Sequence, residues 1–208
     1  MQKYKYLFDM KNTILTSQAL LPDWNEAKNS IFPILSPYKT SKNKLMALKN
    51  QDILCMFVSS QVKMFLACFY NGKIIPLSQQ LLAQWAITAS AVHLAVEENM
   101  RRIAQNTRLK KCNNGWFDYY SVQAELPVFN AALLFYKPFQ FALQQKFGES
   151  FCAVAPELTC GIVFDRKHAQ LYAKAMRDDV HLTYECSSKS LSTELLEISS
   201  YGVVPLVD

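Results

Sequence analysis

Two pairs of apolar segments, each pair joined by a short connector, dominate the hydrophobic pattern of this chain. The first pair is residues 52–60 and 62–70, and the second is residues 151–155 and 160–164. The first pair is nearly continuous in apolar residues, which is typical of strands that are covered on both faces. The pattern predicts two antiparallel hairpins.

A strong turn signal, Asn71-Gly72, follows the first pair. Both positions tolerate a positive φ, so this dipeptide favours a tight hairpin that returns the chain into residues 73–77. We therefore expect three strands to form an antiparallel meander here. Upstream, residues 31–36 form an apolar segment that contains Pro33, and we expect an edge strand because proline cannot donate a backbone hydrogen bond.

Two helical segments come directly after the predicted meander. Ser78 and Thr88 are good N-cap residues and open the segments SQQLLAQWA and TASAVHLAVEENMRRIAQN. Trp85 ends an apolar stripe in the first segment, so we expect it to be buried. In the second segment, a stripe at three- and four-residue spacing predicts one buried face, formed by Ala89, Val92, Val96, Met100 and Ile103.

A third helical segment spans residues 127–147 and ends at Gly148, which is suited to a helix C-cap. Pro138 lies inside this segment, so we expect a kink or a break near Tyr136. Residues 167–177 have the pattern of a short amphipathic helix.

The remaining strands are predicted at residues 116–122, after the turn 113–115, and in the tail 191–208. The tail is expected to turn at Ser200-Tyr201-Gly202. Together these elements predict an α+β fold, with a mainly antiparallel sheet of hairpins packed with several helices. We expect a single globular domain over residues 1–208, made of a lead-in segment 1–30 and a core 31–208.

The composition limits the classes of function. Half of the 208 residues are hydrophobic and 19% are charged, which is typical of a folded protein and too apolar for disorder. The five glycines do not form a phosphate-binding loop, and His93, His168 and His181 lack metal-ligand spacing. We therefore expect neither a cofactor nor a metal.

The formal net charge of +5 has one local concentration, the basic segment RRIAQNTRLKK at residues 101–111. Five cations without an acid favour phosphate groups of nucleic acid, a nucleotide or a phospholipid. The aromatic residues of segment 116–120 follow and can stack bases. The alternative, which we favour, is a helix C-terminus and a solvated loop. The candidate binding residues are Arg101, Arg102, Arg108, Lys110 and Lys111.

The six cysteines contain no CxxC pair, and four of them lie in apolar strand-like runs. We expect free thiols that are mostly unreactive, because burial in apolar surroundings raises a thiol pKa. Cys112, in a polar turn, is expected to react first. Cys160 is near His168 in sequence and Cys152 lies on the same hairpin, so a cysteine-dependent hydrolase is a further, less favoured hypothesis. Glu157, in the hairpin connector, is expected to be exposed and isolated.

The N-terminus lacks the continuous apolar region of a cleaved signal peptide, and the apolar runs are too short to span a bilayer. We therefore expect a cytoplasmic protein without a transmembrane segment.

Several short segments resemble the YtpQ-like family of uncharacterised bacterial proteins, from about residue 29 to the C-terminus. They are NSIFPILS at 29–36, KIIPLSQQLLAQW at 73–85, residues 95–100 with Asn99, and FCAVAPELTCGIVFD at 151–165. The resemblance implies a mixed α/β domain and no established activity. Family members carry an acidic residue three positions after the hairpin proline, where this chain has Thr159.

Our leading hypothesis is a non-catalytic binding or protein-interaction module, because no catalytic spacing stands out. A protein partner is favoured. The rival hypothesis is nucleic-acid or phosphate-ligand binding through residues 101–111.

Overall fold

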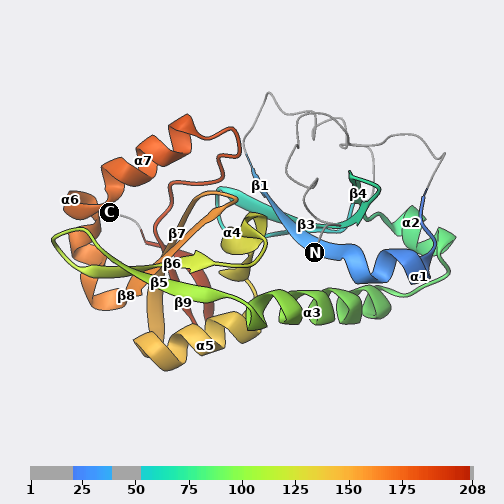
Figure 1. Ribbon diagram of the computed structural model, residues 1–208, viewed down its shortest axis with the longest axis horizontal. Coiled ribbons are helices and arrows are strands. Elements are labelled where there is room, and N and C mark those ends of the chain that lie inside the picture. The colour runs from blue at the N-terminus through green and yellow to red at the C-terminus, as the bar shows by residue number, and fades with distance from the viewer. Residues whose placement is uncertain (1–20, 39–52, 207–208) are drawn as a thin grey trace. The chain divides into compact units, whose positions relative to one another are not determined.

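The computed structural model describes residues 21–38 and 53–206 (Figure 1). Contacts between residues divide the chain into two compact units, which are described separately. The first comprises residues 1–34, 40–56 and 64–101, and the second comprises residues 35–39, 57–63 and 102–208. The prediction of a single domain stays a prediction, whereas the α+β fold class is confirmed.

The four-stranded sheet is built around β3 (Val62–Tyr70), which lies between β1 (Ile31–Pro37) and β2 (Cys55–Phe57). β4 (Lys73–Pro76) pairs antiparallel with the second half of β3, with Tyr70 opposite Lys73. This confirms the predicted hairpin, and Asn71 has a φ of 49° as its turn requires. β1 is an edge strand of this sheet, also as predicted.

β2 corrects the expectation of a strand covered on both faces. It contains only three residues, and Met56 and Phe57 are 57% and 68% exposed. The first unit packs its helices against β3 and β4 instead. Its buried cluster joins these strands to α1 (Trp24–Ala27), α2 (Gln79–Gln84) and α3 (Ala89–Gln105), and comprises Ala27, Ile31, Cys68, Ile75, Leu77, Leu81, Leu82 and Val92.

Both predicted N-caps are confirmed. Ser78 Oγ accepts a hydrogen bond from Leu81 N (3.2 Å), and Thr88 Oγ1 accepts one from Ala91 N (3.3 Å). The apolar stripe of α3 is buried at Val92, Met100 and Ile103 and partly buried at Val96. Ala89 is exposed, so the buried face of α3 starts one turn later than predicted.

Hydrogen bonds from side chains connect the helices of the first unit to the start of β1 and to the chain before it. Trp85 packs against the buried cluster with only part of its side chain exposed, as predicted, and its Nε1 donates to the Pro22 carbonyl (2.8 Å). The buried Asn99 of α3 donates from Nδ2 to the carbonyls of Lys28 and Ile31, both at 2.9 Å. Lys28 belongs to η3 (Lys28–Ser30), which ends the predicted lead-in segment.

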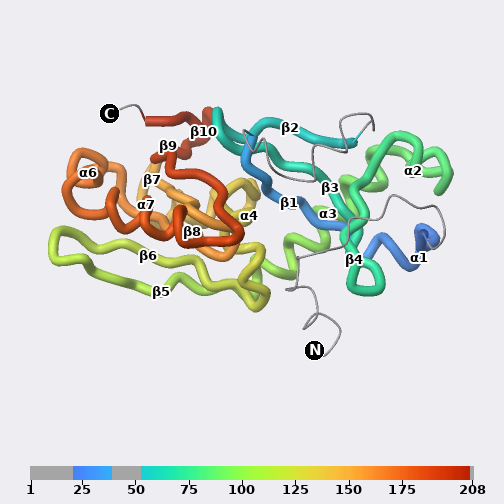
Figure 2. Tube along the Cα trace, turned by 90° about the horizontal axis from the view of Figure 1, so that it is seen from above, coloured from blue at the N-terminus to red at the C-terminus, as the bar shows by residue number. Residues whose placement is uncertain are grey.

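The six-stranded sheet of the second unit has the order β10-β9-β7-β8-β6-β5, and each strand pairs antiparallel with its neighbours (Figure 2). The predicted hairpins at 151–164 and in the tail are both present. The strands are β5 (Arg108–Asn113), β6 (Asp118–Gln123), β7 (Ser150–Glu157), β8 (Cys160–Asp165), β9 (Leu196–Ser199) and β10 (Gly202–Pro205).

Helices cover both faces of this sheet, with α5 on one side and α6 and α7 on the other (Figure 1). On the first side, Phe147 of α5 (Lys137–Phe147) contacts Phe151 of β7. On the second side, Cys152 and Phe164 pack with residues of α6 (Tyr172–Ala175) and α7 (Arg177–Cys186). The central strand β7 is therefore buried on both faces.

The predicted break in the third helical segment is confirmed. η5 (Pro127–Phe129) and α4 (Asn130–Leu133) precede Tyr136, which is the N-cap of α5. Gly148 follows α5 with a φ of 98°, a conformation suited to glycine. Residues 167–177 do not form one helix, because the chain forms η6 (Arg166–Leu171) and α6 and then breaks at Met176. The sequence pattern did not predict α7, since its only buried residue is Val180.

α4 approaches β8 so closely that only glycine fits there. A Cβ atom at Gly161 would lie 2.6 Å from the backbone oxygen of Asn130. The buried Asn130 side chain accepts from Ala124 N (2.8 Å) and donates to the Thr159 carbonyl (2.7 Å). One amide therefore satisfies backbone groups at the end of β6 and in the β7–β8 turn.

Candidate functional site

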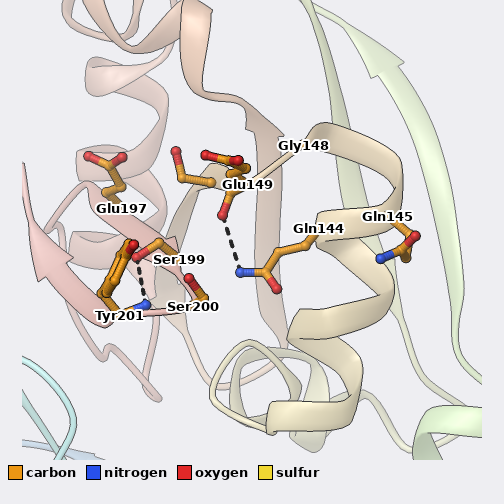
Figure 3. Close-up of a pocket in the computed structure, with 9 residues that line it drawn as sticks. Gln144, Gln145, Gly148, Glu149, Glu197, Ser199, Ser200 and Tyr201 are labelled. Atoms are coloured by element: carbon orange, nitrogen blue, oxygen red, sulfur yellow. Dashed lines mark hydrogen bonds between the residues drawn. The ribbon is translucent and has the colours of Figure 1, made fainter.

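An open groove of about 530 Å³ lies between the end of α5 and the β9–β10 hairpin of the second unit (Figure 3). One wall is the segment from α5 into β7, and the other wall comes from β9 and its turn. Both walls are polar, because each is a chain reversal next to solvent. The lining residues are Gln144, Gln145, Gly148, Glu149, Ser150, Glu197, Ser199, Ser200 and Tyr201.

The groove presents side chains that donate and accept hydrogen bonds. Its lining contains two carboxylates, two carboxamides, three serine hydroxyls and a phenol, without a thiol, an imidazole or a cation. Glu197 is held by Arg166, with 2.9 Å between Nε and Oε2. Gln144 Nε2 donates to the Glu149 carbonyl (3.3 Å), which ties the two ends of this wall together (Figure 3). These groups suit recognition of a polar surface.

Tyr201 stands at the rim of the groove and is 100% exposed. It occupies the predicted turn of the tail hairpin, where its backbone N–H donates to Ser199 Oγ (3.2 Å). The following Gly202 has a φ of 137°, which allows the tight return into β10. A large aromatic side chain is thus held on a short, hydrogen-bonded turn with its whole surface available to a partner.

The five predicted cations do not share one local environment. Arg101 lies on α3 in the first unit and makes a bidentate ion pair with Glu98, with a shortest distance of 2.7 Å. Arg102 is exposed on the same helix, in the part that belongs to the second unit. The other three cations lie on β5. The predicted solvated loop is therefore a strand. Glu98, which neutralises Arg101, lies just before the basic segment 101–111.

The cations of β5 point to both faces of the sheet. Lys111 pairs with Tyr120, whose ring lies 5.4 Å from that of Phe147 on α5. Residues alternate between faces along a strand, so Arg108 and Lys110 lie on the opposite face from Lys111. Lys111 is also ion-paired with Asp118 at 2.7 Å. The hydrogen bond and charge of Lys111 lower the pKa of the Asp118 carboxyl, and the same contact raises the pKa of Lys111.

The aromatic residues after the basic segment do not form a stacking platform. Phe117 is buried, and Tyr119 and Tyr120 are partly buried on opposite faces of β6. Trp116, in the β5–β6 turn, is 58% exposed. The predicted alternation of these side chains through a sheet is what the structure shows.

All six cysteines are free, as expected. Burial raises the pKa of the Cys68 and Cys152 thiols to about 12 and that of Cys160 to about 11. Such thiols are poor nucleophiles at neutral pH. The strand residue Cys55 is exposed, contrary to the expectation that strand cysteines are shielded, and so is Cys186 on α7.

His168 packs against an aromatic ring. Its ring stacks on Phe117 at a centroid distance of 5.0 Å. Cys160 pairs instead with Glu157, whose negative charge also raises the pKa of the thiol. Glu157 is not exposed and isolated as expected, because it is partly buried and accepts hydrogen bonds from Thr159 Oγ1 and Ser187 Oγ. These two hydrogen bonds give Glu157 a structural role in closing the β7–β8 turn.

The sequence pattern did not reveal the groove, because its walls lie about 50 residues apart and carry common surface residues. The only usable signal was the predicted turn at Ser200-Tyr201-Gly202. Among residues 21–38 and 53–206, no three His, Cys, Asp or Glu side chains gather closely enough to hold a metal ion. Over the same residues, no helix combines the length and the apolar character needed to cross a bilayer. Comparisons with protein-family models, with curated proteins and with solved structures found no match.

Proposed function

We propose that this chain is a non-catalytic protein-interaction module that uses the groove beside Tyr201 as a binding surface. The observation that carries this proposal is a fully exposed tyrosine on a hydrogen-bonded turn, next to a groove lined by polar residues. Tyrosine is enriched among the residues that dominate binding energy at protein interfaces. Its ring buries a large area on binding and loses little conformational entropy.

The groove chemistry supports recognition rather than turnover. A cysteine-dependent hydrolase needs a thiolate and a base within hydrogen-bond reach, and the groove lining contains neither a thiol nor an imidazole. An exposed aromatic side chain beside carboxylate, amide and hydroxyl groups combines the two kinds of residue that protein interfaces use, aromatic anchors and polar hydrogen-bonding groups. The resemblance to the YtpQ-like family and a cytoplasmic location remain parts of this proposal.

Site-specific photocrosslinking tests the proposed surface. A benzoylphenylalanine at position 201 is expected to capture a partner in an extract of the producing cells. An excess of the unmodified chain should compete, and the Tyr201→Ala chain should compete at least tenfold less well, a difference of about 1.4 kcal/mol. The matched control places the crosslinker at position 116, where Trp116 is also exposed but outside the groove. Equal capture at both positions contradicts the proposal.

A second candidate, phosphate binding, is supported by Arg108 and Lys110. Both are exposed on one face of β5, and neither has an ion pair with another described residue. The test is an anisotropy titration of a fluorescent single-stranded oligonucleotide at several salt concentrations. The logarithm of the association constant is plotted against the logarithm of the salt concentration. The steepness of this plot should fall by about 0.7 in the variant Arg108→Ala with Lys110→Ala for each phosphate that the variant no longer neutralises. Absence of saturable binding at low salt rejects this candidate.

A further inference from the structure

β5 is the terminal strand of the six-stranded sheet, at the opposite end of the strand order from the Tyr201 hairpin. It pairs with β6 over six consecutive residues without a register shift, from Arg108 opposite Gln123 to Asn113 opposite Asp118. No described strand pairs with its other side, and Figure 2 shows β5 beyond β6 at the margin of the sheet. Such an edge offers a regular row of backbone donors and acceptors to an incoming strand.

The placement of charge on β5 selects for a particular kind of ligand. Arg108 and Lys110 project to one face of the sheet and Lys111 projects to the other. A nucleic acid lying against one face meets at most two of these cations. Lys111 is already ion-paired with Asp118. An extended peptide that pairs with the edge can meet Arg108 and Lys110 with its acidic side chains and also pair with the backbone groups of the edge, which a nucleic acid lying against one face does not do.

We propose that β5 binds an extended, acidic segment of a partner protein, which adds to the sheet as a further strand. Acidic residues at alternate positions of that segment lie beside Arg108 and Lys110, whose side chains are two residues apart on one face. The residue of the partner segment between its two acidic residues lies beside the partly buried Leu109 of β5 and is therefore apolar. This surface is separate from the groove at Tyr201 and does not depend on it.

The same cations discourage pairing of β5 with a second copy of the chain. Like charges directly opposite each other in a sheet are unfavourable, and lysine on an edge strand is a common protection against self-association. Protection alone is the competing explanation for these residues. The two explanations differ in one observable property, which is whether an acidic strand-forming peptide binds.

The probes are three fluorescent decapeptides, tested against the full-length chain by anisotropy. The first alternates glutamate and valine, the second has proline in place of one central valine, and the third has lysine in place of glutamate. We expect saturable binding of the first peptide and roughly tenfold weaker binding of the second, because proline keeps the charge but removes a backbone donor. The lysine peptide should not bind.

The matched variants are Arg108→Glu with Lys110→Glu, and Lys137→Glu with Lys174→Glu. The second pair changes the net charge equally at exposed lysines of α5 and α6. We expect the first pair to weaken binding of the acidic peptide by roughly tenfold or more, because it replaces attraction by repulsion, and the second by at most about twofold. Circular dichroism checks the fold, and Arg108→Ala with Lys110→Ala replaces the first pair if it does not fold.

Hydrogen exchange of the unmodified chain gives a readout that does not depend on any variant. Added peptide should slow exchange of the β5 amides that point away from β6, with little change in the β9–β10 hairpin. Four results overturn the proposal. They are absence of saturable binding of the acidic peptide, equal binding of the proline peptide, tighter binding of a single-stranded oligonucleotide than of the acidic peptide, and unchanged exchange in β5 at saturating peptide.

Discussion

Two apolar runs that look alike in sequence have opposite environments in the folded chain. Residues 151–155 lie in β7, where six consecutive residues are buried. Residues 53–58 contain β2, whose three residues are all exposed. An apolar run therefore predicts a strand but does not predict that the strand is covered. Burial depends on which other elements the chain brings to each face of the strand.

The neighbours of each strand account for the difference. β7 lies between β8 and β9 inside its sheet, with α5 on one face and α7 on the other. β2 is the last strand in the order of the four-stranded sheet, and the buried cluster of the first unit draws on β3 and β4. Phe57 is in contact with Tyr38, at a ring distance of 5.1 Å, and remains mostly exposed.

The same substitution in the two strands tests this difference most directly. Phe151→Ala should lower the free energy of unfolding by about 3–5 kcal/mol, because it removes a fully buried ring from a close-packed site. Phe57→Ala should lower it by less than about 1 kcal/mol. Urea denaturation of both variants measures the two changes. Similar losses of stability in the two variants contradict the comparison.

A smaller effect is expected at the contact between β8 and α4. Gly161→Ala places a Cβ atom against the Asn130 backbone, which cannot move as a flexible side chain would. We expect a loss of about 1–3 kcal/mol in the free energy of unfolding, the range for overpacking a close contact. Thermal and urea unfolding measure it. A loss below about 0.5 kcal/mol, the range of an unconstrained surface site, shows that α4 is not tightly seated on β8.

The thiols of the two strands should differ in their rates of chemical labelling, which tests the comparison without any change in stability. In native protein near neutral pH, iodoacetamide should label the exposed Cys55 of β2 within the time in which Cys152 of β7 stays unmodified. Mass spectrometry of digested samples gives the two rates. Rapid native labelling of Cys152 contradicts its burial and reopens the nucleophile hypothesis.

The raised pKa of Cys152 also predicts a pH dependence. Its thiol shifts from the ordinary value of 9.0 to about 12 on folding, so above pH 9 the unfolded chain releases a proton that the native chain keeps. The free energy of unfolding should therefore fall as the pH rises between about 9 and 12, and the full contribution is present below about pH 9. Cys152→Ala should show a shallower fall over this range in urea denaturation. If the free energy of unfolding falls equally with pH in the unmodified chain and in Cys152→Ala, the raised pKa of Cys152 is contradicted.

The chain's local signals were sufficient for most of its elements. The Asn71-Gly72 turn, the caps at Ser78 and Thr88, and the break at Tyr136 are all present where the sequence predicts them. Each depends on residues within about four positions, through a hydrogen bond or a backbone preference that needs no distant partner. The α+β class follows from the sum of these signals.

The candidate surfaces, in contrast, depend on contacts between distant segments. The groove joins α5 to a hairpin about 50 residues later, and Arg108 and Lys110 became a distinct pair because β5 pairs with β6 as a strand. Glu157 likewise accepts a hydrogen bond from Ser187, which lies 30 residues away in the chain. Local sequence was enough to say where the chain turns and which segments form strands and helices. Packing established which side chains are covered, because burial is a property of neighbours that are distant in the chain.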